Sequence, residues 1–100
     1  MRMQNHWVDQ WSNERIIVLC FTLLSLKHHG NKAMNVQDVE RLIASFDEKI
    51  IKNLFNSIIM REKKKKTQLV RQFQAKQPDI YIEEYVTEKT LYLQLFENVF

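Results

Sequence analysis

Two lysines and two asparagines share one side of a segment with helical periodicity. In SFDEKIIKNLFNSIIMREK the apolar residues recur at i and i+3 or i+4, which predicts a helix that begins at the Ser45/Glu48 capping box or at Asp47. The opposite face carries Lys49, Lys52, Asn53, Asn56 and Ser57, of which the two lysines and two asparagines are the candidates for contact with DNA bases. Lysine donates to guanine O6 and N7 or to phosphate, and asparagine can pair with adenine N6 and N7. The chemistry indicated is contact with base edges, although many exposed helix faces carry these residue types.

A run of basic residues follows this segment. The stretch MREKKKKTQLVRQF, residues 60–73, places four consecutive lysines between a helical apolar pattern and an alternating one. Residues 61–78 hold seven basic groups and one acidic group, whereas residues 79–100 hold one basic group and five acidic groups. Contacts to DNA phosphates, which release counterions, are expected from Arg61, Lys63, Lys64, Lys65, Lys66, Arg71 and Lys76. The alternative is a solvated helix end, where lysines favour the negative end of the helix dipole.

The elements that must position these side chains follow from caps and periodicity. A helix capped by Ser12 or Asn13 is predicted to run to Gly30, which suits a left-handed C′ position, and its apolar residues cover nearly the whole circumference. Asn35 is the predicted cap of a second helix through residues 35–45. The next predicted helix carries Lys49, and it ends near the lysine run or leaves the core there. These patterns place a mostly buried first helix behind the polar face.

The following segments favour strands. TQLVRQFQ and DIYIEEYV are rich in β-branched and aromatic residues, and AKQPD between them contains the only proline. This pattern predicts a β-hairpin, with the lysine run at its root. In the weaker alternative the third helix runs on to about Lys76, which would expose Leu69, Val70 and Phe73. Residues 87–100 are predicted to form a helix capped by Thr87, although the alternation of Leu91, Leu93 and Leu95 also fits a strand.

Length and composition limit the function classes. One hundred residues with 45% hydrophobic residues and a single glycine indicate one mainly helical domain. The single cysteine, Cys20, cannot form an internal disulfide, and the uncharged run Ile16–Leu26 is shorter than the roughly 20 residues that cross a bilayer, so a cytoplasmic protein is expected. His6, His28 and His29 lack the spacing of a metal site. No cofactor and no enzymatic activity are expected, because neither a nucleophile with a base nor a glycine-rich loop is present.

Apolar residues at both ends of the chain predict a homodimer. A chain of this size has little spare core in which to bury a helix that is apolar all round, so a second subunit is the expected cover. The predicted interface residues are Trp7, Trp11, Ile17, Phe21, Leu91, Leu95 and Phe96.

The order of these elements resembles a winged helix-turn-helix domain. The stretch LLSLKHHGNKAMNVQDVERLIASFDEKIIKNLFNSIIMREKKKK is similar to winged-helix regulators related to the MarR and SarA families, and IYIEEYVTEKTLYLQLF resembles their last wing strand and following helix. The resemblance covers about residues 14–96. It departs from the pattern at Thr90, where the families usually have glycine, and in the absence of the wing's Asp and Arg pair. It implies a mainly helical α+β fold of three helices, a β-hairpin wing and a C-terminal helix over residues 14–100, preceded by an arm or short helix at 1–13.

Together these features predict a dimeric, sequence-specific regulator that binds double-stranded DNA. Its third helix would read the major groove, and the lysine run with the wing would hold phosphates. The alternative is a protein-interaction module, such as a phage or plasmid factor that docks on a host protein without binding DNA.

Overall fold

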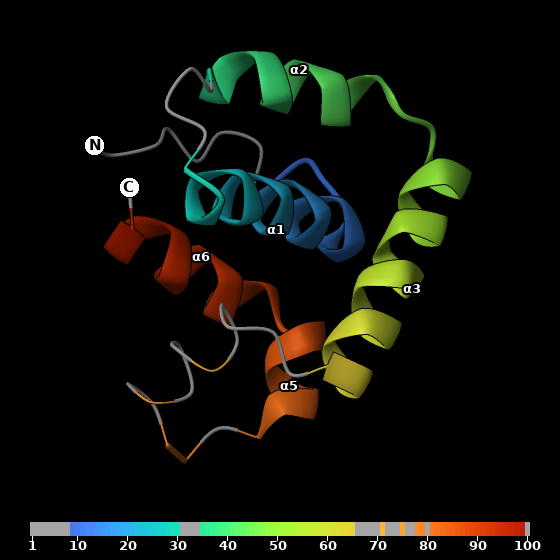
Figure 1. Ribbon diagram of the computed structural model, residues 1–100. Coiled ribbons are helices and arrows are strands. Elements are labelled where there is room, and N and C mark those ends of the chain that lie inside the picture. The colour runs from blue at the N-terminus through green and yellow to red at the C-terminus, as the bar shows by residue number, and fades with distance from the viewer. Residues whose placement is uncertain are drawn as a thin grey trace.

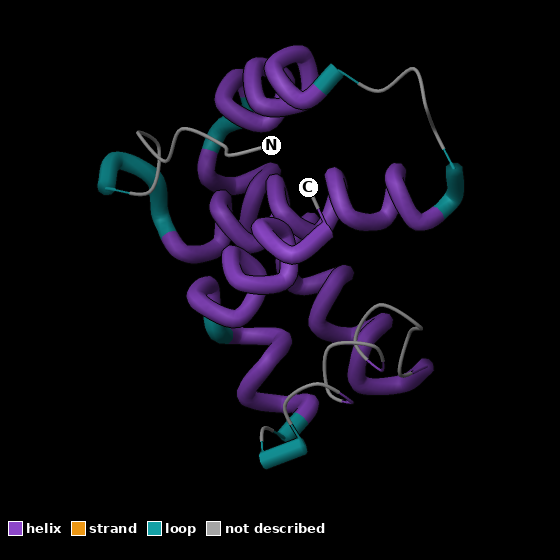
Figure 2. The backbone as a smooth tube through the Cα atoms, turned by 90° about the vertical axis from the view of Figure 1, so that its left-hand side faces the viewer, coloured by secondary structure: helices purple, strands orange, loops and turns teal. Residues whose placement is uncertain are grey.

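Five helices make up the secondary structure that is described. The computed structural model describes residues 9–30, 35–65, 71, 75, 78–79 and 81–99. The helices are α1 (Asn13–His28), α2 (Val36–Ser45), α3 (Glu48–Lys65), α5 (Ile82–Thr87) and α6 (Lys89–Val99). Helix α1 lies in the middle, α2 and α6 lie on either side of it, and α3 runs across one end (Figure 1). Figure 2 shows the same residues as helices and loops with no strand.

Helix α1 forms the centre of the core. The predicted cap Ser12 accepts a hydrogen bond from the Arg15 backbone N–H, and Gly30 follows the helix with φ of 76°, as the sequence predicts. Ile16, Ile17 and Leu19 are fully buried. Burial on most sides is therefore confirmed, because α2, α3 and α6 all pack against α1 within one chain.

Helices α2 and α3 are joined by a connection of two residues, Phe46 and Asp47. The predicted cap Asn35 accepts a hydrogen bond from the Gln37 backbone N–H at 2.9 Å. For α3 the alternative cap is correct, since Asp47 Oδ1 accepts from the Ile50 backbone N–H at 2.9 Å. The Ser45 hydroxyl instead donates to the Leu42 carbonyl within α2, so the capping box does not form.

The predicted wing is wrong. Residues 82–86 of the expected second strand belong to helix α5, and a hairpin needs both of its strands. The expected first strand lies mostly outside the described residues, although Arg71 has helical backbone geometry. Strand preference reflects how well β-branched side chains fit a half-buried surface. It does not decide here, because helix α5 packs on α3 and α6 and buries Val86 completely. The α+β winged-helix class is therefore replaced by helices throughout the described residues.

The C-terminal segment is a helix, as predicted, but its cap differs. Thr87 is the last residue of α5, and the Glu88 carboxylate caps α6 by accepting from the Thr90 backbone N–H and hydroxyl at 3.1 and 2.9 Å. These bonds lower the pKa of Glu88, because they favour its ionised form. Tyr92 is buried against α1, where its ring meets that of Phe21 edge to face at a centroid distance of 6.4 Å.

Candidate nucleic-acid interface on helix α3

The buried stripe of α3 decides which side of this helix faces solvent. Ile51, Ile58 and Glu62 are buried. At 100° per residue these three positions lie within about 40° of one another around the helix. The buried stripe therefore continues to the carboxylate of Glu62, beyond the last apolar residue of the pattern, and the helix itself extends to Lys65.

The four predicted base-contacting residues lie on the opposite side. Lys49, Lys52, Asn53 and Asn56 are all exposed. Their common face follows directly from burial of the inner stripe, since a helix presents residues three and four apart on the same side. Their contact with DNA bases stays a prediction.

The predicted phosphate-contacting residues divide into three groups. Arg61, Lys63 and Lys64 are exposed in the last turns of α3, and Arg71 is exposed beyond it. Lys65 is the final residue of α3, described by its backbone alone. Lys66 and Lys76 lie outside the described residues. The expected position of the run at the root of a wing is wrong, because the first three lysines belong to the helix.

The first carboxylate of α3 is engaged by an arginine from α1. Glu48 Oε1 lies 2.9 Å from Arg15 Nη2 and 3.2 Å from Arg15 Nε. The Ser12 hydroxyl also donates to Glu48, at 3.2 Å. Although the Glu48 side chain is 51% exposed, its charge is matched by a nearly buried guanidinium. The negative charge at the start of α3 is thus turned toward α1.

Arg15 also holds the end of α2. Its Nη1 donates to the carbonyls of Ile43 and Ala44 at 2.7 and 3.2 Å, and the Trp11 ring lies over the guanidinium at 5.7 Å. One side chain thereby connects α1, the last turn of α2 and the first turn of α3. The sequence analysis missed this role, although an arginine among the apolar residues of a buried helix is a usable signal.

The second carboxylate of α3 is removed from the surface by burial. Glu62 is 0% exposed and lies in the interior with Tyr92 and Cys20. Burial raises the pKa of Tyr92, and the charges of Glu62 and Cys20 raise it further. The sequence analysis missed this cluster, although Glu62 stands four residues after Ile58, the spacing of the apolar stripe.

These two placements give the outer face of α3 one sign of charge. Among the described residues of the helix, the exposed charged groups that are not engaged by Arg15 are lysines and Arg61. The sequence alone shows a mixed helix with Glu48 and Glu62 among its cations. The tertiary structure separates the two signs.

The predicted dimer-interface residues lie mostly inside one chain. Ile17, Phe21, Leu95 and Phe96 are buried in the core. Trp11 and Leu91 are partly buried and pack against that core, and Trp7 lies outside the described residues. The cover that the sequence analysis assigned to a second subunit is supplied by α3 and α6, and the homodimer stays a prediction.

No family model, no curated protein and no solved structure matches this chain. The resemblance to winged-helix regulators thus rests on the sequence patterns alone, and its wing segment is helix α5. No group of three or more His, Cys, Asp or Glu side chains is placed to hold a metal ion among the described residues. None of the helices described here combines the length and the apolar character needed to cross a membrane.

Proposed function

We propose that this chain is a regulator that binds double-stranded DNA through the outer face of α3. Lys49, Lys52, Asn53 and Asn56 face the base edges, and Lys63 and Lys64 extend along phosphates. The observation that carries the proposal is the single sign of charge on this face, produced by the pairing of Glu48 and the burial of Glu62. A face of one sign attracts a polyanion, whereas interspersed carboxylates would repel it.

The dimensions of α3 suit this role. From Lys49 to Lys64 the helix advances about 22 Å at 1.5 Å per residue. The major groove is about 12 Å wide and admits one helix. Buried Ile51 and Ile58 fix the opposite side of α3 on α1, so the exposed side chains project from a supported element.

The proposal predicts binding to duplex DNA that weakens steeply with salt. Each phosphate neutralised by a lysine contributes about −0.9 to the slope of log K against log salt on B-DNA. Replacing Lys63 and Lys64 by alanine should reduce the steepness by about 1.8, because two fewer counterions are released. Replacing Asn53 and Asn56 by alanine should leave the slope unchanged and flatten the preference among duplex sequences. Fluorescence anisotropy of labelled 20-bp duplexes from 50 to 300 mM NaCl measures both effects.

A matched control removes the same charge from other elements. The double variant Lys27→Ala/Arg41→Ala loses two exposed cations from α1 and α2 and should keep the slope of the original chain. Absence of binding at 50 mM salt would overturn the proposal. So would an equal loss of affinity in the control variant, since it would indicate attraction by net charge alone.

The alternative partner is an acidic protein surface, and exposed apolar residues on α3 favour it. Met60 is 59% exposed and Ile50 43% exposed on this otherwise basic helix. Apolar anchors of this kind carry protein interfaces, whereas they add little to phosphate contacts. Met60→Ala and Ile50→Ala should change DNA affinity less than twofold if DNA is the ligand, and the same anisotropy assay measures this.

We propose a homodimer as the assembly that binds DNA. Two copies related by a two-fold axis would place two α3 helices in successive major-groove turns, about 34 Å apart. Sedimentation velocity of the chain with and without duplex gives the stoichiometry. A complex with one chain per duplex at saturation would contradict the dimer while leaving the α3 interface intact.

A further inference from the structure

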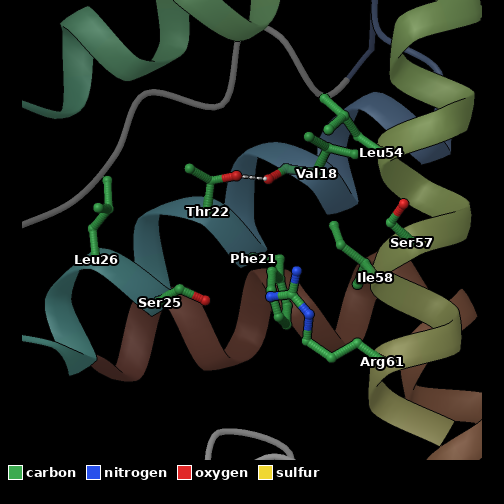
Figure 3. Close-up of a pocket in the computed structure, with 9 residues that line it drawn as sticks. All are labelled: Val18, Phe21, Thr22, Ser25, Leu26, Leu54, Ser57, Ile58 and Arg61. Atoms are coloured by element: carbon green, nitrogen blue, oxygen red, sulfur yellow. Dashed lines mark hydrogen bonds between the residues drawn. The ribbon is translucent and has the colours of Figure 1, made fainter. Parts of the chain in front are cut away.

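A cavity opens between α1 and α3, beside the basic face. Its volume is about 240 Å³. Its apolar lining comes from Val18, Phe21 and Leu26 of α1 and from Leu54 and Ile58 of α3. Figure 3 shows these side chains around the opening, with Arg61 reaching across from α3 toward Phe21.

Among the described residues that line the cavity, Arg61 is the one with a charged side chain. Its guanidinium lies 6.0 Å from the centroid of the Phe21 ring, which keeps the positive charge over the cavity. The described part of the chain places no carboxylate in an ion pair with Arg61. The fork of guanidinium N–H donors is therefore available to an anion from outside.

Three hydroxyls line the cavity, those of Thr22, Ser25 and Ser57, and two of them donate within their own helices. Thr22 Oγ1 donates to the Val18 carbonyl at 2.7 Å, drawn as a dashed line in Figure 3, and Ser57 Oγ donates to the Asn53 carbonyl at 3.0 Å. Their protons are thus committed to backbone carbonyls. Arg61 is the one charged donor among the described lining residues, so an anion is the polar group that this end of the cavity suits best.

We propose that this cavity binds a small carboxylate with an aliphatic chain, the chain between α1 and α3 and the carboxylate on Arg61. A cavity of about 150 Å³ lined by apolar side chains accommodates benzene, so 240 Å³ holds a larger apolar body. The opening toward solvent suits a flexible chain whose charged end stays near water. Arginine binds a carboxylate through two parallel N–H bonds, which fixes the orientation of the ligand.

Octanoate is the probe that tests this site. Titration followed by ¹H–¹⁵N NMR should shift backbone amides on the facing sides of α1 and α3. Octanol has the same chain without charge, and octylammonium reverses the charge, so each should bind at least about tenfold more weakly than octanoate, since a charge-assisted hydrogen bond contributes that much.

Substitutions separate the two halves of the site. Arg61→Gln should weaken octanoate binding about tenfold or more and leave octanol binding unchanged. Ser57→Phe, at an exposed position of the lining, should fill the cavity and abolish binding of both probes. Arg41→Gln is the matched control, because it removes an exposed arginine from α2, and it should bind octanoate like the original chain.

The proposal fails under any of three results. One is absence of amide shifts at 10 mM octanoate. Another is equal octanoate affinity in Arg61→Gln and in the original chain. The third is a set of shifts that lies outside α1 and α3. Because these measurements contain no DNA, they stand independently of the proposed DNA binding.

Discussion

Arg15 is the residue at which three helices are joined. Its guanidinium binds two carbonyls at the end of α2 and the carboxylate at the start of α3. The carbonyl bonds are the more important part for stability, because the Ile43 carbonyl is buried while Glu48 is half exposed. A buried acceptor that loses its donor keeps its full desolvation cost, whereas an exposed carboxylate regains water.

Arg15→Met should therefore destabilise the chain far more than Glu48→Gln. We expect a loss of about 2–3 kcal/mol for Arg15→Met, since the buried Ile43 carbonyl keeps only the longer 3.4 Å bond from the Phe46 backbone N–H and the Ala44 carbonyl loses its Arg15 donor. Glu48→Gln should cost about 1 kcal/mol, because the Glu48 side chain is half exposed and the glutamine amide oxygen can still accept from Arg15. Urea unfolding followed by circular dichroism at 222 nm gives both free energies. Equal losses in the two variants would show that the ion pair, and not the carbonyl bonds, holds the helices together.

Cys20 gives stability a dependence on alkaline pH. Burial raises the pKa of its thiol from the ordinary value of 9.0 to about 12. Below pH 9 the thiol is protonated in both folded and unfolded chains, so its contribution is fully present. Between pH 9 and 12 the unfolded chain releases the proton first, and stability falls with rising pH.

Cys20→Ala should flatten this decline. Ionisation of the thiol lowers the free energy of unfolding by up to about 1.4 kcal/mol per pH unit across that window. The variant has no thiol and should not show this part of the decline. Tyr92, whose pKa is raised mainly by burial, stays in both chains, and the substitution removes only the smaller part of that shift that comes from the charge of Cys20. Urea unfolding at half-unit steps from pH 7 to 10.5 provides the comparison. Parallel profiles for the two chains would contradict a protonated, buried thiol.

At the scale of the elements, Gly30 terminates α1 in the left-handed conformation. Its φ is 76°, and a Cβ placed there would meet no atom within 4 Å. A side chain at this position would therefore cost free energy because of the backbone conformation, and not because it would clash with the rest of the fold. Such a C′ position favours glycine and, less strongly, asparagine.

Gly30→Ala should destabilise the chain by about 1 kcal/mol, the ordinary cost of the left-handed conformation for an L-residue. Gly30→Asn should lose less, since asparagine enters this region more readily. Thermal and urea unfolding of the two variants provide the measurement. An Ala variant as stable as the original chain would show that α1 ends differently in solution.

For helix α3 the apolar periodicity predicts the start and the polar face, but it does not predict how far the helix extends. Its start at Asp47 and its polar face follow from spacing and caps, and both are found. Its length does not follow, because the inner stripe passes from Ile58 to Glu62 and a carboxylate does not register as apolar. For helix α5 the composition is misleading in the opposite way. The β-branched and aromatic residues from Ile82 to Val86 favour a strand, but they form a helix in which Val86 is buried in the core.

At the scale of the whole molecule, one chain closes its own core. The radius of gyration is 12.9 Å, close to the ~13 Å of a compact 100-residue domain. Ile17, Phe21, Leu95 and Phe96 are buried without a second subunit. A dimer would therefore form through other surfaces than these four buried residues, and its contact would have to leave the outer face of α3 open for DNA.

Local rules determined most of the helices directly from the sequence. The caps at Ser12 and Asn35, the glycine at position 30 and the two faces of α3 each depend on neighbours within one or two turns. The tertiary structure decided the role of Arg15, the burial of Glu62 and the cavity beneath Arg61. These depend on which helices meet in space. The single sign of charge on α3 belongs with them, because only contacts with α1 and the core withdraw its two carboxylates.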